Sequence, residues 1–190
     1  MAEMLSPLQT KCVAGRFGAS GDVGVTLGTR PIMDLWQIAN WDLLASSASP
    51  ALNALGLDGP GDYRCAQQAG PVTSWRIAPD KILLEGAGDM TAHASVDLMV
   101  LDLSHAKVAV TLQGARARDV LSQLIAIDTA PGAFKRGDFV QTGIHHVGVL
   151  IHCTGDDTFS ILIPASWSET VWEVLFDNAL PHGLSVVEAA

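Results

Sequence analysis

The chain has 190 residues, of which 48% are hydrophobic and only 16% are charged. This composition excludes an intrinsically disordered protein because ample apolar surface is available for burial. The formal net charge of −9, with no Lys or Arg from Gly137 to Ala190, argues against a nucleic-acid partner, which requires a basic stripe. No apolar run reaches the ~18–20 residues of a membrane span, so we expect no membrane partner either. The scarcity of charge predicts that a protein partner covers part of the surface.

The first part of the chain predicts short elements separated by loops. Alternating apolar residues predict a strand at Val23–Leu27, within a glycine-rich surface segment, and mixed aromatic and branched residues predict another at Leu35–Trp41. Ser49-Pro50 indicates an N-cap followed by proline in the first turn of a short helix. A loop from Gly56 to Gly70 follows that helix.

A hairpin is predicted next. Trp75–Ile77 and Ile82–Leu84 flank the turn residues Pro79-Asp80, which predicts two strands whose apolar residues face one way. Asp89–Val96 is predicted to be a short helix, and the alternating residues of Lys107–Leu112 predict a strand.

Two amphipathic helices are predicted in the second half. Apolar residues spaced at i, i+3, i+4, i+7 and i+8 predict the first: Ala117, Val120, Leu121, Leu124 and Ile125. Two strands, Val147–Cys153 and Phe159–Ile163, follow and are joined at Gly155-Asp156-Asp157. The pair Ser166 and Glu169 has the spacing of a capping box and predicts the start of the second helix. Its predicted apolar face comprises Trp167, Val171, Val174 and Leu175.

Leu184–Val187 is predicted to be the last strand. The order from Lys107 onward is β-α-β-β-α-β, which is typical of ferredoxin-like sandwiches. We therefore predict the α+β class, with antiparallel sheets and helices packed on one face. Residues 1–190 are expected to form a single domain, with two interleaved lobes at about 1–100 and 101–190 as the alternative.

The residue types that could carry chemistry do not form a recognisable site. The densest group of potential metal ligands is His145, His146, His152 and Cys153. His146 and His152 would share one face of a strand, but zinc needs three or four converging ligands. The sequence Asp102-Leu-Ser-His105 predicts a turn, because a catalytic triad is assembled from distant segments. Asp156-Asp157 are predicted to be solvated turn acids. We predict no catalytic, cofactor-binding or metal-binding residues.

The three cysteines are predicted to be free thiols. Cys12, Cys65 and Cys153 are odd in number, widely spaced and without a CxxC pair. Because no secretory signal is visible and free thiols are typical of a reducing compartment, we expect a cytoplasmic protein.

Several stretches resemble a known family when they are taken in order. They are Ala-Pro-Asp-Lys-Ile-Leu-Leu at 78–84, Asp-Leu-Ser-His-Ala at 102–106, and the segments 112–121 and 159–172. Their order and spacing resemble the gamma subunit of heterotetrameric sarcosine oxidase over nearly the whole chain. The gamma-type subunits of N-methylglutamate dehydrogenase look much the same, so both families stay open here.

The resemblance implies a non-catalytic structural subunit. Complexes of this type demethylate sarcosine to glycine oxidatively and pass the one-carbon unit to tetrahydrofolate. The resemblance places FAD, FMN, NAD, folate and zinc in the partner subunits, alpha, beta and delta, and no cofactor in this chain.

The resemblance also implies a relation to the folate-binding aminomethyltransferases of the glycine cleavage system, and hence a fold like their folate-binding domain. Those enzymes carry a Thr/Ala-Asn-Asp motif where this chain has Ala126-Ile127-Asp128, and a catalytic aspartate near the position of Val147-Gly148. Neither Val nor Gly can take a proton. A stand-alone folate-binding or aminomethyltransferase-like protein is therefore the alternative function, and a weaker one.

Five tryptophans occur in the chain, and Trp is enriched where proteins meet. We expect Trp36 and Trp41, with Trp167 as a weaker candidate, to lie at an interface and therefore to be accessible to solvent in the isolated chain. At least one Trp should be accessible to solvent within a large apolar patch, which the isolated chain would cover by self-association.

Overall fold

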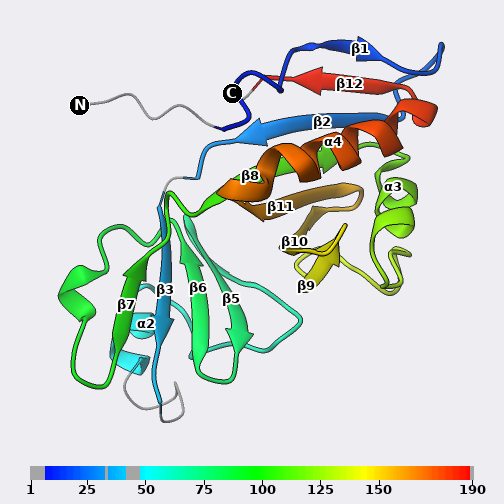
Figure 1. Ribbon diagram of the computed structural model, residues 1–190. Helices are drawn as coiled ribbons and strands as arrows, with labels where there is room; N and C mark the ends of the chain where they lie inside the picture. Colours follow the sequence, from blue (N-terminus) through cyan, green and yellow to red (C-terminus); the bar gives the residue numbers. More distant parts are fainter. Residues whose placement is uncertain (1–6, 33, 42–47, 189–190) are drawn as a thin grey trace. The chain divides into compact units, whose positions relative to one another are not determined.

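The computed structural model describes residues 7–32, 34–41 and 48–188, which form two compact units of mixed α and β structure (Figure 1). Unit 1 comprises the described residues up to Pro31, together with Ala106–Arg136 and the chain from Gln141 onward. Unit 2 comprises Ile32–His105 and Gly137–Val140. No helix within the described residues is long and apolar enough to cross a bilayer.

Seven strands form the larger sheet, in the order β1-β12-β2-β8-β11-β10-β9. They are β1 Gly15–Phe17, β2 Val25–Arg30, β8 Lys107–Gln113, β9 Phe139–Ile144, β10 Val147–Gly155, β11 Thr158–Pro164 and β12 Leu184–Val187. The predicted strands of the second half are all present. The order β12, β8, β11, β10 is that of a ferredoxin-like sheet, but β2 lies between β12 and β8 and pairs with β12 in parallel.

Alternation along the strands explains why one face of this sheet is apolar. Leu27, Leu112, Phe159 and Cys153 are cross-strand partners in one row, and all four are buried. Residues two positions along each strand point the same way, so the rows on either side also place apolar side chains on this face. β9 was not predicted, because only its end residues are buried and its interior positions alternate between partly buried and exposed.

Two helices pack together in unit 1 (Figure 1). They are α3, Ala117–Leu124, and α4, Ser168–Ala179, and the latter follows a 3-10 turn, Ala165–Trp167. The second 3-10 turn of this region is Leu180–His182. α3 buries Ala117, Val120 and Leu121 as predicted.

The start of α4 differs from the prediction. The helix has no side-chain cap hydrogen bond, and its N-cap is Trp167 rather than Ser166. Because the preceding 3-10 turn winds three residues per turn, the buried face is shifted. It comprises Ser168, Val171, Trp172, Leu175 and Ala179.

Unit 2 is built on a five-stranded sheet in the order β4-β5-β6-β3-β7. Its elements are β3 Leu35–Ala39, α2 Ser49–Ala54, β4 Gln67–Ala69, β5 Val72–Ala78, β6 Lys81–Glu85, a 3-10 turn Thr91–His93 and β7 Met99–Asp102. The helix predicted at Asp89–Val96 is therefore only the 3-10 turn. The helix predicted from Ser49-Pro50 is present with Pro in its first turn, although its N-cap is Ala48.

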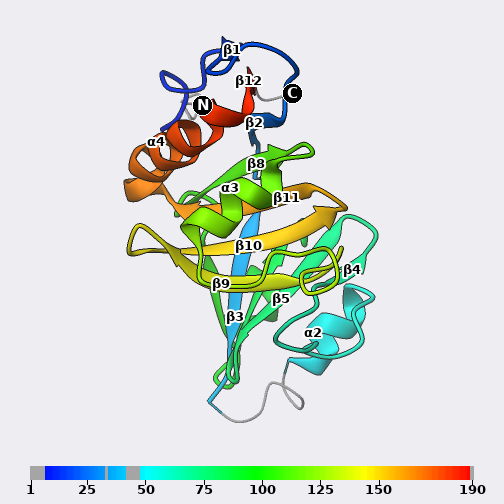
Figure 2. The ribbon, with the colours of Figure 1, turned by 90° about the vertical axis from the view of Figure 1, so that its right-hand side faces the viewer.

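The α2 helix covers one face of this sheet (Figure 2), and the apolar side chains between the helix and the sheet form the core of unit 2. Leu52 of α2 packs with Ile38, Ile82 and Leu84 of the central strands, and Trp36 belongs to the same cluster. Trp36 is only 8% exposed, so the expectation that it is accessible to solvent was wrong. Its position on a central strand, rather than at the end of the segment, explains the burial.

The β5–β6 hairpin is confirmed, but its apolar residues do not all face one way. Trp75 pairs with Leu83, whereas Ser74 pairs with Leu84. Cross-strand partners share a face, so Trp75 lies on the opposite face of the sheet from Leu84. The strands are buried on both faces, which the alternation in the sequence does not reveal.

Two histidines form the turn of the hairpin between β9 and β10. His145 and His146 both have positive φ, 48° and 68°, as a two-residue type I′ turn requires. His146 therefore lies in the turn and not on a strand face beside His152. A left-handed conformation costs a residue with a Cβ roughly 1–2 kcal/mol, and such turns favour Asn-Gly.

We expect the double variant His145→Asn/His146→Gly to raise the free energy of unfolding by about 1–2 kcal/mol, because it relieves this backbone strain. Urea denaturation measures the gain. The matched control, His145→Ala/His146→Ala, removes the imidazoles but keeps the strain, and should not gain stability. Equal stability of the Asn-Gly and Ala-Ala variants would contradict this prediction.

Candidate functional site

The potential metal ligands identified in the sequence do not converge. His145 and His146 form the turn that precedes β10, whereas His152 and Cys153 lie toward the other end of that strand. Side chains of successive strand residues alternate between faces, so His152 and Cys153 point to opposite sides of the sheet. Within residues 7–32, 34–41 and 48–188, no group of three or more His, Cys, Asp or Glu side chains could hold a metal ion.

The segment after β7 forms the turn that its sequence predicted. Asp102 Oδ1 accepts hydrogen bonds from the backbone N–H of Ser104 (2.9 Å) and from its hydroxyl (2.6 Å). The Ser104 hydroxyl in turn accepts from the N–H of Leu35 (3.0 Å). The hydrogen bonds from Ser104 lower the pKa of Asp102. These groups stabilise a turn and do not assemble into a Ser-His-Asp triad.

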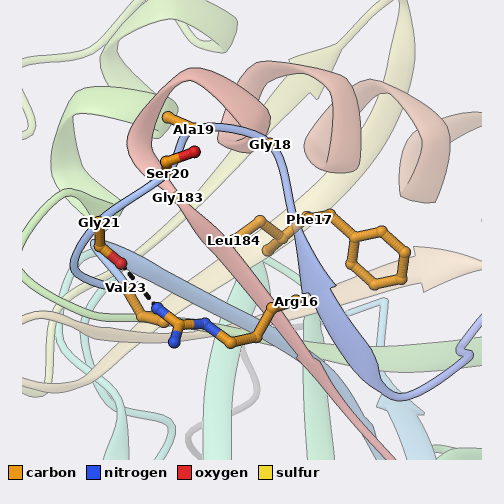
Figure 3. A pocket seen from close by; sticks show the side chains of 9 residues that line it. All are labelled: Arg16, Phe17, Gly18, Ala19, Ser20, Gly21, Val23, Gly183 and Leu184. Carbon is orange, nitrogen blue, oxygen red and sulfur yellow. Dashed lines mark hydrogen bonds between the residues drawn. The ribbon is translucent and has the colours of Figure 1, made fainter.

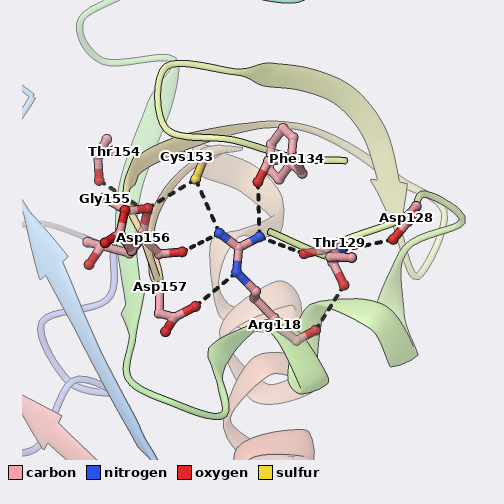
Figure 4. A network of polar contacts seen from close by, with 11 residues as sticks. Arg118, Asp128, Thr129, Phe134, Cys153, Thr154, Gly155, Asp156 and Asp157 are labelled. Atoms are coloured by element: carbon pink, nitrogen blue, oxygen red, sulfur yellow. Dashed lines mark hydrogen bonds and ion pairs between the residues drawn. The ribbon is translucent and has the colours of Figure 1, made fainter. Parts of the chain in front are cut away.

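The most extensive polar cluster centres on Arg118 of α3, whose side chain is 11% exposed (Figure 4). Its Nε donates to Asp157 Oδ1 at 2.9 Å. Its Nη1 donates to the carbonyl oxygens of Thr129 (2.6 Å) and Phe134 (3.0 Å). Its Nη2 donates to the carbonyl oxygen of Asp156. We call this cluster, with Cys153, the Arg118 network.

The guanidinium of Arg118 is enclosed by further contacts. Its Nη2 lies 3.9 Å from Cys153 Sγ, so each of its five N–H donors has an acceptor. The ring centroid of Phe159 lies 5.1 Å from the guanidinium carbon, a cation–π distance. The ring of Phe134 stacks on Phe159 with a centroid separation of 6.0 Å. No donor of Arg118 is left over for a substrate.

The Arg118 network therefore has a structural role: it joins α3, the loop at 129–134 and the β10–β11 turn. The sequence prediction that both turn acids are merely solvated was incomplete, because Asp157 binds the guanidinium. One indication of the network is present in the sequence, because Arg118 falls at the border of the apolar face of α3, where a side chain can be partly buried. Its partners come from separate segments, so the sequence could not identify them.

The positions related to the aminomethyltransferase motifs are occupied differently in this chain. Asp128 is exposed and accepts a hydrogen bond from the N–H of Ala130 at 2.9 Å, so it stabilises its own loop. Val147 and Gly148 begin β10, and the side chain of Val147 is buried. Neither provides a carboxylate to protonate or to stabilise a cationic substrate.

A surface pocket of about 330 Å³ lies beside β1 and the glycine-rich segment that follows it (Figure 3). Arg16 is its only charged lining residue, and one of its Nη atoms donates to the carbonyl of Gly21 at 2.7 Å. Ser20 supplies a hydroxyl, and Gly183 and Leu184 form part of the wall. The lining contains no acid or histidine that could act in proton transfer.

Two of the three tryptophans expected at an interface are exposed. Trp41 is 89% exposed and Trp167 is 53% exposed, which confirms that accessible tryptophans exist. Trp167 is exposed because the 3-10 turn rotates it away from the buried face of α4. Further exposed apolar side chains are Val13, Phe17, Val23, Tyr63, Val96, Met99, Leu101 and Val187.

The cysteines form no disulfide. All three lie in the described part of the chain, where Cys12 and Cys153 are buried and Cys65 is exposed. Burial and the nearby charges of Asp62 and Asp138 raise the pKa of Cys65, so this exposed thiol is not activated. The prediction of three thiols without a disulfide is confirmed.

The fold is that of the aminomethyltransferase-like proteins. The structure of heterotetrameric sarcosine oxidase from Corynebacterium sp. U-96, in complex with pyrrole 2-carboxylate, contains a similar chain. The two share 22% sequence identity with a TM-score of 0.80, over 94% of this chain and 96% of that chain. The glycine cleavage system aminomethyltransferase T from Bartonella henselae is 16% identical with a TM-score of 0.54, over 88% of this chain and 48% of that one.

Residues 45–180 match the sarcosine oxidase, gamma subunit family. The chain belongs to that family. No curated protein sequence matches it.

Proposed function

We propose that this chain is a non-catalytic structural subunit of a heterotetrameric sarcosine oxidase-type complex in the cytoplasm. The family match over residues 45–180 carries the proposal. In the proposed complex the alpha, beta and delta subunits hold FAD, FMN, NAD, folate and zinc. They perform the oxidative demethylation of sarcosine to glycine, with transfer of the one-carbon unit to tetrahydrofolate.

The polar residues of this chain support a structural role. The guanidinium of Arg118 is saturated by protein acceptors, and Asp128 stabilises its own loop. The positions Val147 and Gly148 carry no acid. Exposed Trp41 and Trp167 supply the large apolar area that an interface requires.

The competing function is folate chemistry by this chain alone, which the likeness to an aminomethyltransferase favours. Titration of the isolated full-length chain with tetrahydrofolate separates the two functions. We expect no saturable binding in the micromolar range. Saturable micromolar binding, abolished by Asp128→Asn, would support the folate-binding alternative.

The direct test of the proposal is co-expression of the tagged full-length chain with the alpha, beta and delta subunits of a heterotetrameric sarcosine oxidase-type complex. We expect a stable complex that contains this chain in stoichiometric amount and oxidises sarcosine. Leaving out this chain should reduce the yield of assembled complex. Sarcosine and N-methylglutamate, supplied in parallel, distinguish the two types of complex. A fully active, stable complex that forms without this chain would contradict the proposal.

A further inference from the structure

The five-stranded sheet of unit 2 ends in two edges of different character. β4, at one edge, has the sequence Gln67-Gln68-Ala69, so its exposed position carries an amide. β7, at the other edge, exposes Met99 (59%) and Leu101 (52%). Proteins usually protect an edge strand with charged residues or proline. β7 carries one charged residue, Asp102, at its end, but it presents two large apolar side chains on one face of the strand, since residues two apart point the same way.

The outward backbone groups of β7 can be assigned from its pairing with β3. The N–H of Leu103 donates to the carbonyl of Leu35, and Leu101 and Met99 continue the same alternation opposite Gln37 and Ala39. In an antiparallel pair, the intervening residues direct their N–H and C=O groups away from the partner strand. The backbone groups of Val100 and Asp102 therefore point outward. In the described part of the chain no strand pairs with them.

The charged residues next to β7 in the sequence are acids, whereas Lys81 lies two strands away, in the row of Ala39 and Met99. The chain carries no Lys or Arg between Lys81 and Lys107, but it carries four acids there: Glu85, Asp89, Asp97 and Asp102. Three of them, Asp89, Asp97 and Asp102, are exposed. A strand that pairs here meets apolar side chains flanked by carboxylates. Complementarity requires a segment with alternating apolar residues and basic flanks.

We propose that β7 is a docking edge, to which a larger subunit of the complex adds an extended segment as a sixth strand. The segment pairs with the outward groups of Val100 and Asp102, places apolar side chains against Met99 and Leu101, and brings Lys or Arg to the surrounding acids. Main-chain pairing supplies affinity in this mode of recognition, and the side chains supply specificity. The inference rests on the proposed function, because it names the surface through which this chain joins the complex.

The variant Met99→Lys/Leu101→Lys tests the docking edge in the co-expressed complex. It changes only exposed side chains and places positive charge opposite the basic segment, so we expect about a tenfold loss of this chain from the purified complex. Gln68→Lys at the opposite edge and Val13→Lys in unit 1 are the matched controls and should assemble normally. Circular dichroism and thermal melting of each isolated variant establish that it is folded.

Amide hydrogen exchange provides a second readout that needs no substitution. On assembly, the N–H groups of Val100 and Asp102 should exchange about tenfold more slowly than in the free chain. The N–H groups of Met99 and Leu101 are already paired with β3, so their exchange rates should change little. Failure of the unsubstituted chain to join any complex overturns the proposed function and this inference together. Assembly of the double variant at the normal level, or unprotected Val100 and Asp102, overturns the docking edge alone. A complex in which β7 pairs with a second copy of this chain also overturns it.

Discussion

Replacing Arg118 with alanine is expected to lower the free energy of unfolding by about 2–3 kcal/mol, because several acceptors lose a charged hydrogen-bond donor that is itself only 11% exposed. The variant leaves the carbonyl oxygens of Thr129, Phe134 and Asp156 without their donor. Each desolvated polar group that loses its partner destabilises the folded state. The cation–π contact with Phe159 is lost as well. Urea denaturation measures the change.

Two variants on the same helix serve as controls for Arg118→Ala. Arg118→Lys keeps the positive charge but cannot reproduce the five donors of a guanidinium, so we expect an intermediate loss. Arg116→Ala, at the N-cap of the helix, removes an exposed arginine that pairs with half-exposed Asp119 at 2.9 Å. Exposed pairs contribute about 0–1 kcal/mol, so this variant should be nearly as stable as the unsubstituted chain. Equal losses for Arg116→Ala and Arg118→Ala would show that the network does not stabilise the fold.

Lowering the pH from 7 to 4 is expected to destabilise the chain by about 3 kcal/mol through His152 alone. Burial and, to a smaller extent, the positive charge of Arg30 together lower the pKa of His152 from 6.5 to about 4. Between these two values the unfolded chain takes up a proton that the folded chain does not. Stability contributed by neutral His152 is therefore fully present above pH 6.5 and is lost as the pH falls toward 4.

The measurement is the free energy of unfolding against pH, compared between variants. His152→Gln should remove the part of the slope between pH 6.5 and 4 that belongs to this histidine. His105→Gln changes an exposed histidine and should keep the slope of the unsubstituted chain. Other groups titrate in the same pH range, so the test compares the pH dependence of the two variants with each other. Parallel curves for all three proteins would contradict the assignment to His152.

The sequence predicted those elements whose apolar residues are periodic or closely spaced. They are α3 and the strands β8, β10, β11 and β12, and the structure confirms them. β9 was not predicted because only its two end residues are buried. The face of α4 was shifted because hydrophobic spacing does not show a 3-10 turn before a helix.

Tertiary contacts account for the remaining differences. Trp36 and Trp41 lie in one strand-like segment, and the sequence offered no basis for separating them. The structure places Trp36 on a central strand and Trp41 beyond its end, so one is buried and the other exposed. The Arg118 network joins a helix, a loop and a strand turn, and local patterns do not encode such a meeting of distant segments.

The position of β12 between β1 and β2 affects the order in which the chain can fold. Residues Leu184–Val187 separate two strands that come from the first thirty residues, so β1 has no neighbour in its sheet until Leu184–Val187 have been synthesised. Contacts of such long sequence separation slow folding, and domains generally fold as units during synthesis. The nearly continuous segment Ile32–His105 can therefore form its structure on the ribosome before β1 and β2 pair with β12. A nascent chain that stops before Leu184 leaves both β1 and β2 with an exposed edge, which makes truncated products of this gene prone to aggregation.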